Sequence, residues 1–472
     1  MENIKEPSLK ISLIVLIGIL IILLSGTLIF KINIVLLLIL SIIYIGIIGK
    51  FNNISQKEII EYMSYGCSKA FIGLLFFILI GGIIGIFILS GTVPTLVYYG
   101  LNILSPKFFL PTTLLICTLL SSIIGSSWST VGTVGIAIIG IATTSNLSIP
   151  LPIIVGAIVS GAWFGDKMSP VSDSTVMTAT SVGANVYDHI KVMSMTTLPA
   201  YIISLIAYTI INSFYEVKDI DINNIQIIKN TLNSVYNISI LNFIPLLILI
   251  ILSVLKIDAI KSLLITIGIA ILCTIFLQNK TLYDCFEAIM NGVNINTNNI
   301  EVDTLLNRGG INSMMSTFLL CFFALSMGGV LEKCGFLKVI IKGITKKLKS
   351  TFGIVFTTMS TCILGTAIFA DIYLSIILNG NMYKEEFKKR GLKNTMLSRT
   401  IEEGTTLFAP LIPWTAASAF ITATLNVATI DYAKYTILNL VNPILSLIFT
   451  LLGIFIVKIK KINLKNIIQI LK

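Results

Sequence analysis

Eleven long stretches without Asp, Glu, Lys or Arg constrain the fold more than any other feature of the sequence. They are 11–30, 32–49, 70–106, 108–165, 192–215, 230–255, 262–279, 309–331, 350–370, 404–430 and 435–457. About 20 apolar residues cross the hydrocarbon core of a bilayer as a helix. Only 12% of the 472 residues are charged, about half the fraction in soluble domains. The sequence therefore predicts an all-α polytopic membrane protein.

Two stretches are awkward as single crossings and predict re-entrant hairpins, over 108–143 and 350–383. Their midpoints carry GSSWST and GTAIFAD. Residues 150–185 and 396–424 each predict one crossing that is broken at the membrane midplane. With eight further crossings and a cytoplasmic N-terminus, 25 basic residues fall in cytoplasmic segments and seven in extracytoplasmic ones. The positive-inside rule favours this orientation, which also places the C-terminus in the cytoplasm.

The two halves of the sequence resemble each other. Gly125 lies 240 positions before Gly365, and Pro170 lies 240 before Pro410. GIFILSG precedes GVLEKCG by 244 positions. Five crossings and a hairpin in each half would invert the second half, the inverted-repeat architecture of secondary transporters, whose interrupted helices hold the substrate. The predicted organisation is a first repeat, 1–212, an extracytoplasmic linker, 213–238, and a second repeat, 239–472.

The four interrupted segments concentrate oxygen-bearing side chains at membrane depth. Alkali cations prefer oxygen ligands, and a broken helix frees backbone carbonyls where it lines a cavity. Because burial disfavours a charged carboxylate, a proton can compete with a cation for the same oxygens, which suffices for antiport. The predicted cation ligands are Asp166, Ser172, Asp173, Ser174, Thr175, Asp371, Ser375, Glu402, Glu403, Thr405 and Thr406. The predicted substrate-contacting residues at or near the first hairpin tip are Ser126, Ser127, Ser129, Thr130 and Lys167.

Several residues also have a structural interpretation. Lys167 could neutralise a neighbouring acid such as Asp166 or Asp173, and Glu402 and Glu403 follow a basic loop closely enough to lie near the membrane interface. His189, the single histidine, is predicted to be a solvated loop residue. The seven cysteines have no metal-binding spacing and are predicted to be packing residues. The three arginines are predicted to lie in loops; they are Arg308, Arg390 and Arg399.

Four motifs carry a family resemblance. They are SGAWFGDKMSPVSDSTVMTATSVGANVYDHI, LSIILNGNMYKEEFKKRGL with LSRTIEEGTTLFAPLIPW, SGTVPTLVYYGL and GSSWSTVGTVG. Together they resemble the NhaC-type sodium/proton antiporters. The resemblance implies a secondary transporter in a bacterial-type plasma membrane, with Asp166, Asp173 and Asp371 on the acids of the family pattern. One departure is Ala370, where that pattern has glycine before the last acid.

These features predict exchange of sodium for protons through buried carboxylates, with no cofactor. The alternative is a sodium-coupled carrier of a small organic substrate, by malate–lactate exchange or amino-acid transport. Hydroxyl-rich hairpin tips suit a carboxylate group. An organic-anion carrier would be expected to place arginine at membrane depth, so arginines in loops favour the cation antiporter.

Two other classes fit less well. An intramembrane aspartyl protease would use Asp166 and Asp371 as a dyad, but the repeats and hydroxyl clusters have no place in it. A channel would usually reach symmetry by assembling subunits. Lysines at the ends of apolar runs, without a basic groove, argue against binding to nucleic acid. The predicted partners are membrane lipid, the sodium ion, an organic anion or amino acid in the alternative, and a second copy of the chain by analogy.

Overall fold

The computed structural model describes residues 7–458 except 51–53, 70, 104–105, 145–146, 171, 216–221, 256, 258, 337–338 and 340–349. Within this part of the chain the regular structure is helical, with one isolated β-bridge between Leu392 and Lys458. Seven of its helices are long and apolar enough to cross a membrane, or up to ten if each bent pair is one span. The all-helical, multi-pass prediction is confirmed. The basic segments 340–349 and 459–472, which helped to set the orientation, lie outside the described residues.

The helices of the first half and the linker are α1 (Leu9–Leu28), α2 (Ile34–Lys50), α3 (Gln56–Lys69), α4 (Phe71–Leu89), α5 (Thr92–Ile103), η1 (Pro106–Phe108), α6 (Phe109–Ile124), α7 (Ser127–Thr130), the π-helical η2 (Val131–Gly135), α8 (Ile136–Thr144), α9 (Leu151–Met168), α10 (Asp173–Ser181), α11 (Val186–Ser213) and α12 (Ile222–Val235). Those of the second half are η3 (Ile240–Phe243), α13 (Ile244–Val254), α14 (Ala259–Gln278), α15 (Leu282–Asn291), α16 (Ile300–Leu306), α17 (Ile311–Lys333), α19 (Thr351–Phe369), α20 (Ile372–Lys389), α21 (Asn394–Thr405), η4 (Ala409–Leu411), α22 (Ala416–Leu425), α23 (Thr429–Tyr432), η5 (Ala433–Tyr435) and α24 (Ile437–Leu451).

The first hairpin consists of α6 and the run from α7 to α8. A Cβ added at Gly161 of α9 would meet Leu114, and one added at Gly165 would meet Thr118, so α6 runs parallel to α9. In the second arm Ser127 bonds to Asp166, whereas Gly135 faces the earlier residue Ile158, so this arm is antiparallel to α9. The two arms are therefore antiparallel to each other.

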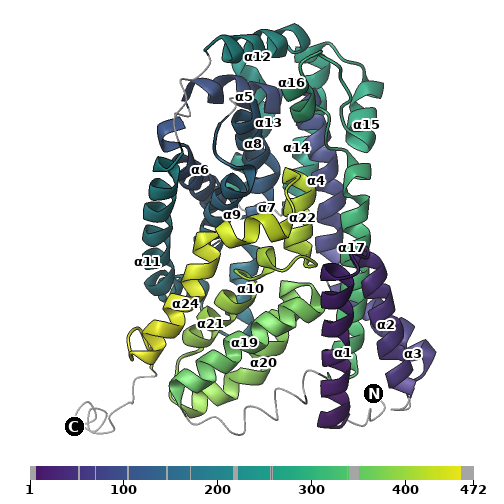
Figure 1. The fold of residues 1–472 in the computed structure, drawn as a ribbon, viewed down its shortest axis with the longest axis vertical. Helices are drawn as coiled ribbons and strands as arrows, with labels where there is room; N and C mark the ends of the chain where they lie inside the picture. The colour runs from purple at the N-terminus through teal and green to yellow at the C-terminus, as the bar shows by residue number, and fades with distance from the viewer. Residues whose placement is uncertain are drawn as a thin grey trace, which may run out of the picture.

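The second hairpin consists of α19 and α20. Thr361 of α19 donates a hydrogen bond to the Tyr383 hydroxyl at 3.0 Å, and Gly365 packs against Ser375. Residue numbers rise along one arm as they fall along the other, so the arms are antiparallel. Figure 1 shows the helices of the first hairpin in the upper half of the molecule and those of the second in the lower half. The hairpins thus enter from opposite ends.

Both predicted broken helices are interrupted where the sequence has small residues and proline. α9 ends at Met168, and α10 begins after Ser172, whose hydroxyl accepts from Thr175 N. α21 ends at Thr405, and α22 begins after Thr415, whose hydroxyl accepts from Ser418 N. A serine or threonine at the N-cap satisfies a free N–H of the new helix start, so each break is followed by a defined second segment.

Helix starts recur at a nearly constant offset between the halves. The capping residues Ser126 and Asp371 are 245 positions apart, and the caps Ser172 and Thr415 are 243 apart. α9 and α21 also begin 243 positions apart. The repeated order of hairpin, broken helix and final helix fits the predicted repeats.

This offset corrects two of the predicted residue pairs. Gly125 occupies the left-handed turn of the first hairpin, and Ala370, not Gly365, occupies that of the second. By the same offset Pro170 corresponds to Pro413 in place of Pro410. The pairing at 240 positions failed because glycine and proline are frequent in membrane helices, so chance matches lie close to the true ones.

The two halves also contact each other reciprocally. A Cβ at Gly329 of α17 would lie 2.6 Å from Gly66 Cα of α3, and one at Gly85 of α4 would lie 2.0 Å from Ala288 O of α15. Gly85 and Gly329 are the first residues of the matched GIFILSG and GVLEKCG segments. Each half therefore packs its amphipathic helix against the glycine face of the other half's long helix, as inverted repeats require.

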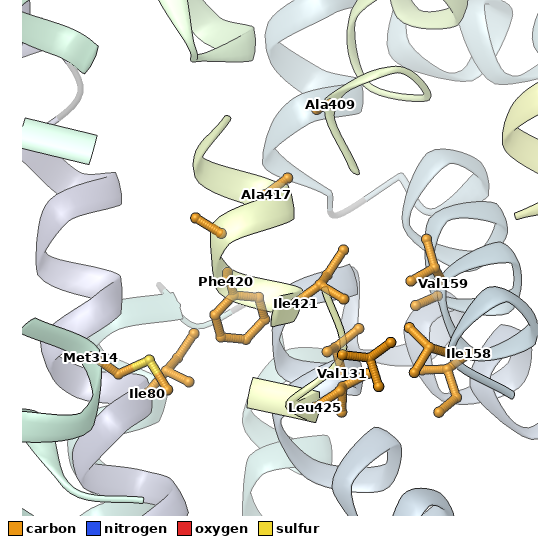
Figure 2. Packing of buried hydrophobic residues seen from close by; sticks show 14 of the residues in the cluster. Ile80, Val131, Ile158, Val159, Met314, Ala409, Ala417, Phe420, Ile421 and Leu425 are labelled. Atoms are coloured by element: carbon orange, nitrogen blue, oxygen red, sulfur yellow. The ribbon is translucent and has the colours of Figure 1, made fainter. Parts of the chain in front are cut away.

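The hydrophobic core joins the first hairpin tip to the second half. Phe420 of α22 stacks on Trp128 of α7 with ring centroids 4.7 Å apart. Figure 2 shows Ile421 and Leu425 of α22 beside Val131 of the π-helical segment, with Ile158 of α9 adjoining. Since all four of these aliphatic side chains are buried, the apolar contact fixes where the first hairpin tip lies.

Two predicted single crossings are bent. Within 70–106, α4 and α5 meet at an angle of 65°, and Gly91 has φ 79° at the bend. Within 230–255, the chain turns by 82° between α12 and the helix that follows. α12 occupies most of the predicted linker, so the described part of that segment is helical. Hydropathy gives the length of an apolar stretch, but it does not show where the helix axis changes direction within that stretch.

We expect Ala370→Gly to raise the stability of the protein. Ala370 has φ 53°, a left-handed conformation that alanine adopts at a cost of about 1 kcal/mol and glycine adopts freely. The expected gain is about 0.5–1 kcal/mol, seen as a higher midpoint of thermal unfolding in detergent. Ala367→Gly, in the helical arm of the same hairpin, is the control and should lower the midpoint.

Candidate functional site

The first broken helix meets both hairpin tips. Ser127, at the first tip, donates a hydrogen bond to Asp166 Oδ2 at 2.7 Å. Tyr373, just after the second tip, donates one to Asp173 Oδ2. Asp371 caps the helix that contains Tyr373. Asp166, Asp173 and Asp371 therefore lie where the first broken helix meets the two hairpin tips, and we call this group the aspartate site.

Asp166 has the geometry expected of an ion-binding carboxylate. Its side chain is 4% exposed. Oδ2 accepts from Ser127, whereas Oδ1 is buried and has no hydrogen-bond partner. Its backbone oxygen belongs to the last turn of α9 and faces the Thr175 hydroxyl at 3.4 Å. A buried carboxylate with one bound and one free oxygen has a place for a proton or a cation.

Asp371 lies at the second hairpin tip because Ala370 turns the chain out of α19. It caps α20, with Oδ1 accepting from Leu374 N at 3.1 Å, and it is 6% exposed. Asp173 begins α10 and accepts from Ser174 N at 2.9 Å. Its side chain is exposed, unlike the buried acid that the sequence suggested.

The predicted hydroxyl ligands bond mainly to nearby backbone. Ser126 caps α7 by accepting from Ser129 N at 3.2 Å, and Thr130 donates to Ser126 O at 3.0 Å. In the second hairpin Ser375 donates to Cys362 O at 3.0 Å. Ser172 and Ser174 bond to each other at 3.1 Å. These residues shape the helix starts, and their oxygens retain lone pairs for a cation.

The predicted acids of α21 form a second group. Glu402 and Glu403 are both fully buried inside the protein, and their position near the membrane interface stays a prediction. Glu403 Oε1 accepts from Thr196 at 2.5 Å and from Asn442 at 3.2 Å, and its Oε2 lies 4.0 Å from Arg399 Nε. The Glu402 carboxylate faces Lys167 and the hydroxyls of Thr178 and Thr406. Adjacent glutamates thus have different surroundings: Glu403 holds helices together, and Glu402 faces a buried lysine.

Lys167 belongs to the α21 group and not to the aspartates. It is fully buried, Nζ has no hydrogen-bond partner, and its charge interacts with Glu403 and Glu402. The interpretation that Lys167 neutralises a neighbouring acid stays a prediction, with Glu402 and Glu403 as the acids that it faces. Consecutive residues of a helix point about 100° apart, so Asp166 and Lys167 face different neighbours.

The break after α21 connects the two broken helices. Trp163 Nε1 of α9 donates to Thr406 O at 2.9 Å. Thr405 donates its hydroxyl to Ile401 O at 2.7 Å. In the described part of the chain no three His, Cys, Asp or Glu side chains are placed to hold a metal ion together. A transported cation would therefore need hydroxyl and carbonyl oxygens as well as a carboxylate.

The matches to known proteins agree with this arrangement. The sequence model described as the Na+/H+ antiporter family matches residues 4–193 and 161–454. The chain belongs to the Na+/H+ antiporter family. The chain is 34% identical to the Na+/H+ antiporter NhaC of Alkalihalophilus pseudofirmus, over 88% of this chain and 90% of the relative. The predicted resemblance to NhaC-type antiporters is confirmed.

Two further relatives carry names with organic substrates. The malate-2H+/Na+-lactate antiporter of Bacillus subtilis is 34% identical over 97% of this chain and 97% of its own. The arginine/ornithine antiporter ArcD of Halobacterium salinarum is 30% identical over 95% of this chain and 93% of its own. These relatives thus have similar sequences, but their names refer to different transported substrates.

Sequence reasoning misplaced two titratable residues of this antiporter-family protein. Arg399 lies within α21 and is fully buried, so the prediction that every arginine is in a loop was wrong. Its spacing of four from Glu403 was the available signal. His189 is also fully buried, with Nδ1 2.7 Å from the Ser398 hydroxyl, and is not a solvated residue.

The cysteines have no disulfide partners: all seven are free, and all but Cys67 are buried. This agrees with their interpretation as packing residues.

Proposed function

We propose that the protein is a secondary active transporter that exchanges sodium for protons across a bacterial-type plasma membrane, with both termini cytoplasmic. Sodium and protons are its cargo, and it needs no cofactor. The observation that carries the proposal is the buried Asp166 carboxylate, with one bound and one free oxygen, where two hairpin tips meet a broken helix. Family membership supports the same reading.

Exchange follows from competition at that carboxylate. A sodium ion at the free oxygen of Asp166 would find oxygens of Ser127, Ser172 and Thr175 nearby, and a proton on the same oxygen removes the charge that holds the ion. Because the two occupants exclude each other, each passage of a cation in one direction requires a proton in the other. The two inverted repeats would give the site access to each side in turn.

A sodium-coupled carrier of a small organic substrate is the second candidate. Arg399 and Lys167 are basic residues that are fully buried in the protein. The placement of all arginines in loops, which favoured the cation antiporter over an organic-anion carrier, therefore no longer counts against this candidate. The names of the malate/lactate and arginine/ornithine relatives support this candidate. Arg399 is already paired with Glu403 at 4.0 Å, so the sodium-for-proton reading remains the better supported.

Proton flux in proteoliposomes distinguishes the two candidates. With a pH dye inside, sodium chloride added outside should discharge an imposed proton gradient without any organic substrate. Asp173→Asn should slow this flux, because it removes one negative charge from the aspartate site, the carboxylate that accepts a hydrogen bond from Tyr373. If nothing moves until malate, lactate or an amino acid is added, the protein is a carrier of that substrate and the sodium-for-proton proposal is wrong.

A further inference from the structure

The last helix has a polar face although that face is buried in the protein. Asn439, Asn442, Ser446 and Thr450 follow helical spacing along α24 and are at most 3% exposed. The opposite face is apolar and outward, as at Ile444, which is 56% exposed. Buried polar groups at membrane depth are costly unless they are satisfied. This polar face of α24, here called the polar stripe, therefore requires hydrogen-bond partners, which an apolar packing face does not.

The polar stripe faces α21. Asn439 Nδ2 donates to Leu407 O at 3.0 Å, and Asn442 Nδ2 donates to Glu403 Oε1 at 3.2 Å. Residue numbers rise along α24 while they fall along α21, so the two helices are antiparallel here. Figure 1 shows α21 and α24 next to each other in the lower half of the molecule.

The same register continues toward the end of α24. One helical turn beyond Asn442, Ser446 lies at the level of Arg399, and Thr450 follows at the level of Thr395. Arg399 Nη1 donates to Phe455 O at 3.1 Å, just past α24. Polar groups therefore run from Glu403 to the lower end of α24, which is predicted to face the cytoplasm. We call this line the polar seam.

Many atoms of the polar seam are buried without a hydrogen-bond partner, although more than about 90% of buried polar atoms in proteins have one. Within the described residues the unpartnered atoms of the seam are Asn439 Oδ1, Asn442 Oδ1, Ser446 Oγ and Thr395 Oγ1. Arg399 Nε and Glu403 Oε2 make no hydrogen bond but face each other as an ion pair at 4.0 Å. Glu402 is the residue before Glu403 on α21, and Lys167 interacts with both glutamates. The seam thus offers amide oxygens that accept and hydroxyls that accept or donate, and water satisfies both kinds of group.

We propose that the polar seam holds a file of water molecules that carries protons between the cytoplasmic end of α24 and Glu402. Each water accepts a proton from one neighbour and passes one to the next, so the number of protons in the file is unchanged, and the waters reorient before the next transfer. The proposal rests on the proposed sodium-for-proton exchange and supplies the cytoplasmic part of the proton's route, up to Glu402, while competition with sodium stays at Asp166. Glu402 is its inner terminus because its buried carboxylate faces Lys167 and the hydroxyls of Thr178 and Thr406, whereas Glu403 is held by Thr196 and Asn442.

The first test asks whether water reaches the polar seam. Silver ions, which travel in water and react with thiolates, are added to the cytoplasmic side of the full-length protein in membranes, and unreacted thiols are then counted. Ser446→Cys should react at least about tenfold faster than Ile444→Cys, because a thiol ionises in water and not in lipid. The unsubstituted chain with its seven native cysteines gives the background. Equal rates for Ser446→Cys and Ile444→Cys would overturn the proposal.

The second test asks whether the file carries the transported proton. Ser446→Val fills the seam with an apolar group, and sodium-driven proton flux should fall by about tenfold. The rate ratio between H2O and D2O should rise, while equilibrium binding of radioactive sodium stays unchanged. Ser204→Val is the matched control: Ser204 is equally buried, but its hydroxyl donates to Ala200 O at 2.7 Å. If both variants change the flux and the isotope ratio alike, the seam does not carry the proton.

The two tests separate this inference from the proposed function. Silver accessibility does not depend on transport, so an accessible Ser446→Cys in a protein without sodium-driven flux would refute the exchange proposal alone. Normal flux with an inaccessible Ser446→Cys would refute the polar seam alone.

Discussion

Asp166→Asn should abolish sodium-driven proton flux, lowering the rate by about 100-fold or more. The variant keeps the size of the side chain and removes the charge, and losing one charge interaction of about 3 kcal/mol in a buried site accounts for two orders of magnitude. Asp166 is the acid to choose because it is buried and bonded to Ser127 at 2.7 Å. The measurement is the proteoliposome flux with a pH dye inside.

Asp188→Asn provides the matched control for this result. Asp188 lies in the first turn of α11, is exposed, and makes no contact with the aspartate site. Its substitution should leave the flux within about twofold. Wild-type flux in Asp166→Asn would show that the coupling carboxylate is elsewhere, and the fully buried Glu402 would then be the residue to test.

Arg399→Met should destabilise the folded protein by about 3–5 kcal/mol, the usual cost of leaving a buried charge without its partner. Arg399 and Glu403 are both fully buried, and the pair joins α21 to the end of α24 through Phe455 O. The measurement is thermal unfolding in detergent. The double variant Arg399→Met with Glu403→Met should recover much of the loss, because neither charge then stays buried alone.

The chain offers a closely matched control for the ion pair. Arg390 pairs with Glu386 at 2.8 Å with the same spacing of four, but the side chains are 17% and 25% exposed. Arg390→Met should cost less than about 1 kcal/mol, as partly exposed pairs usually do. Equal losses for Arg390→Met and Arg399→Met would mean that burial does not set the strength of the α21 pair.

The breaks in the helices could be predicted because their causes are local. Proline removes a backbone donor, glycine permits the left-handed turn, and a Ser or Asp caps the next helix. All of these act within a few residues. The hairpin turn at Gly125 and the break around Pro170 were therefore found from the sequence alone. Within GTAIFAD, Gly365 and not Ala370 was paired with Gly125, because alanine gives no such local signal.

The sequence by itself determined that this chain spans a membrane, where its helices break, and which acids stand at the breaks. Only the tertiary structure decided which residues these acids contact, and that Arg399 and His189 are buried. The reason is distance along the chain. Tyr373 meets Asp173 across 200 residues, and Asn442 meets Glu403 from a different helix. Periodicity places a side chain on a face, but only packing decides what that face meets.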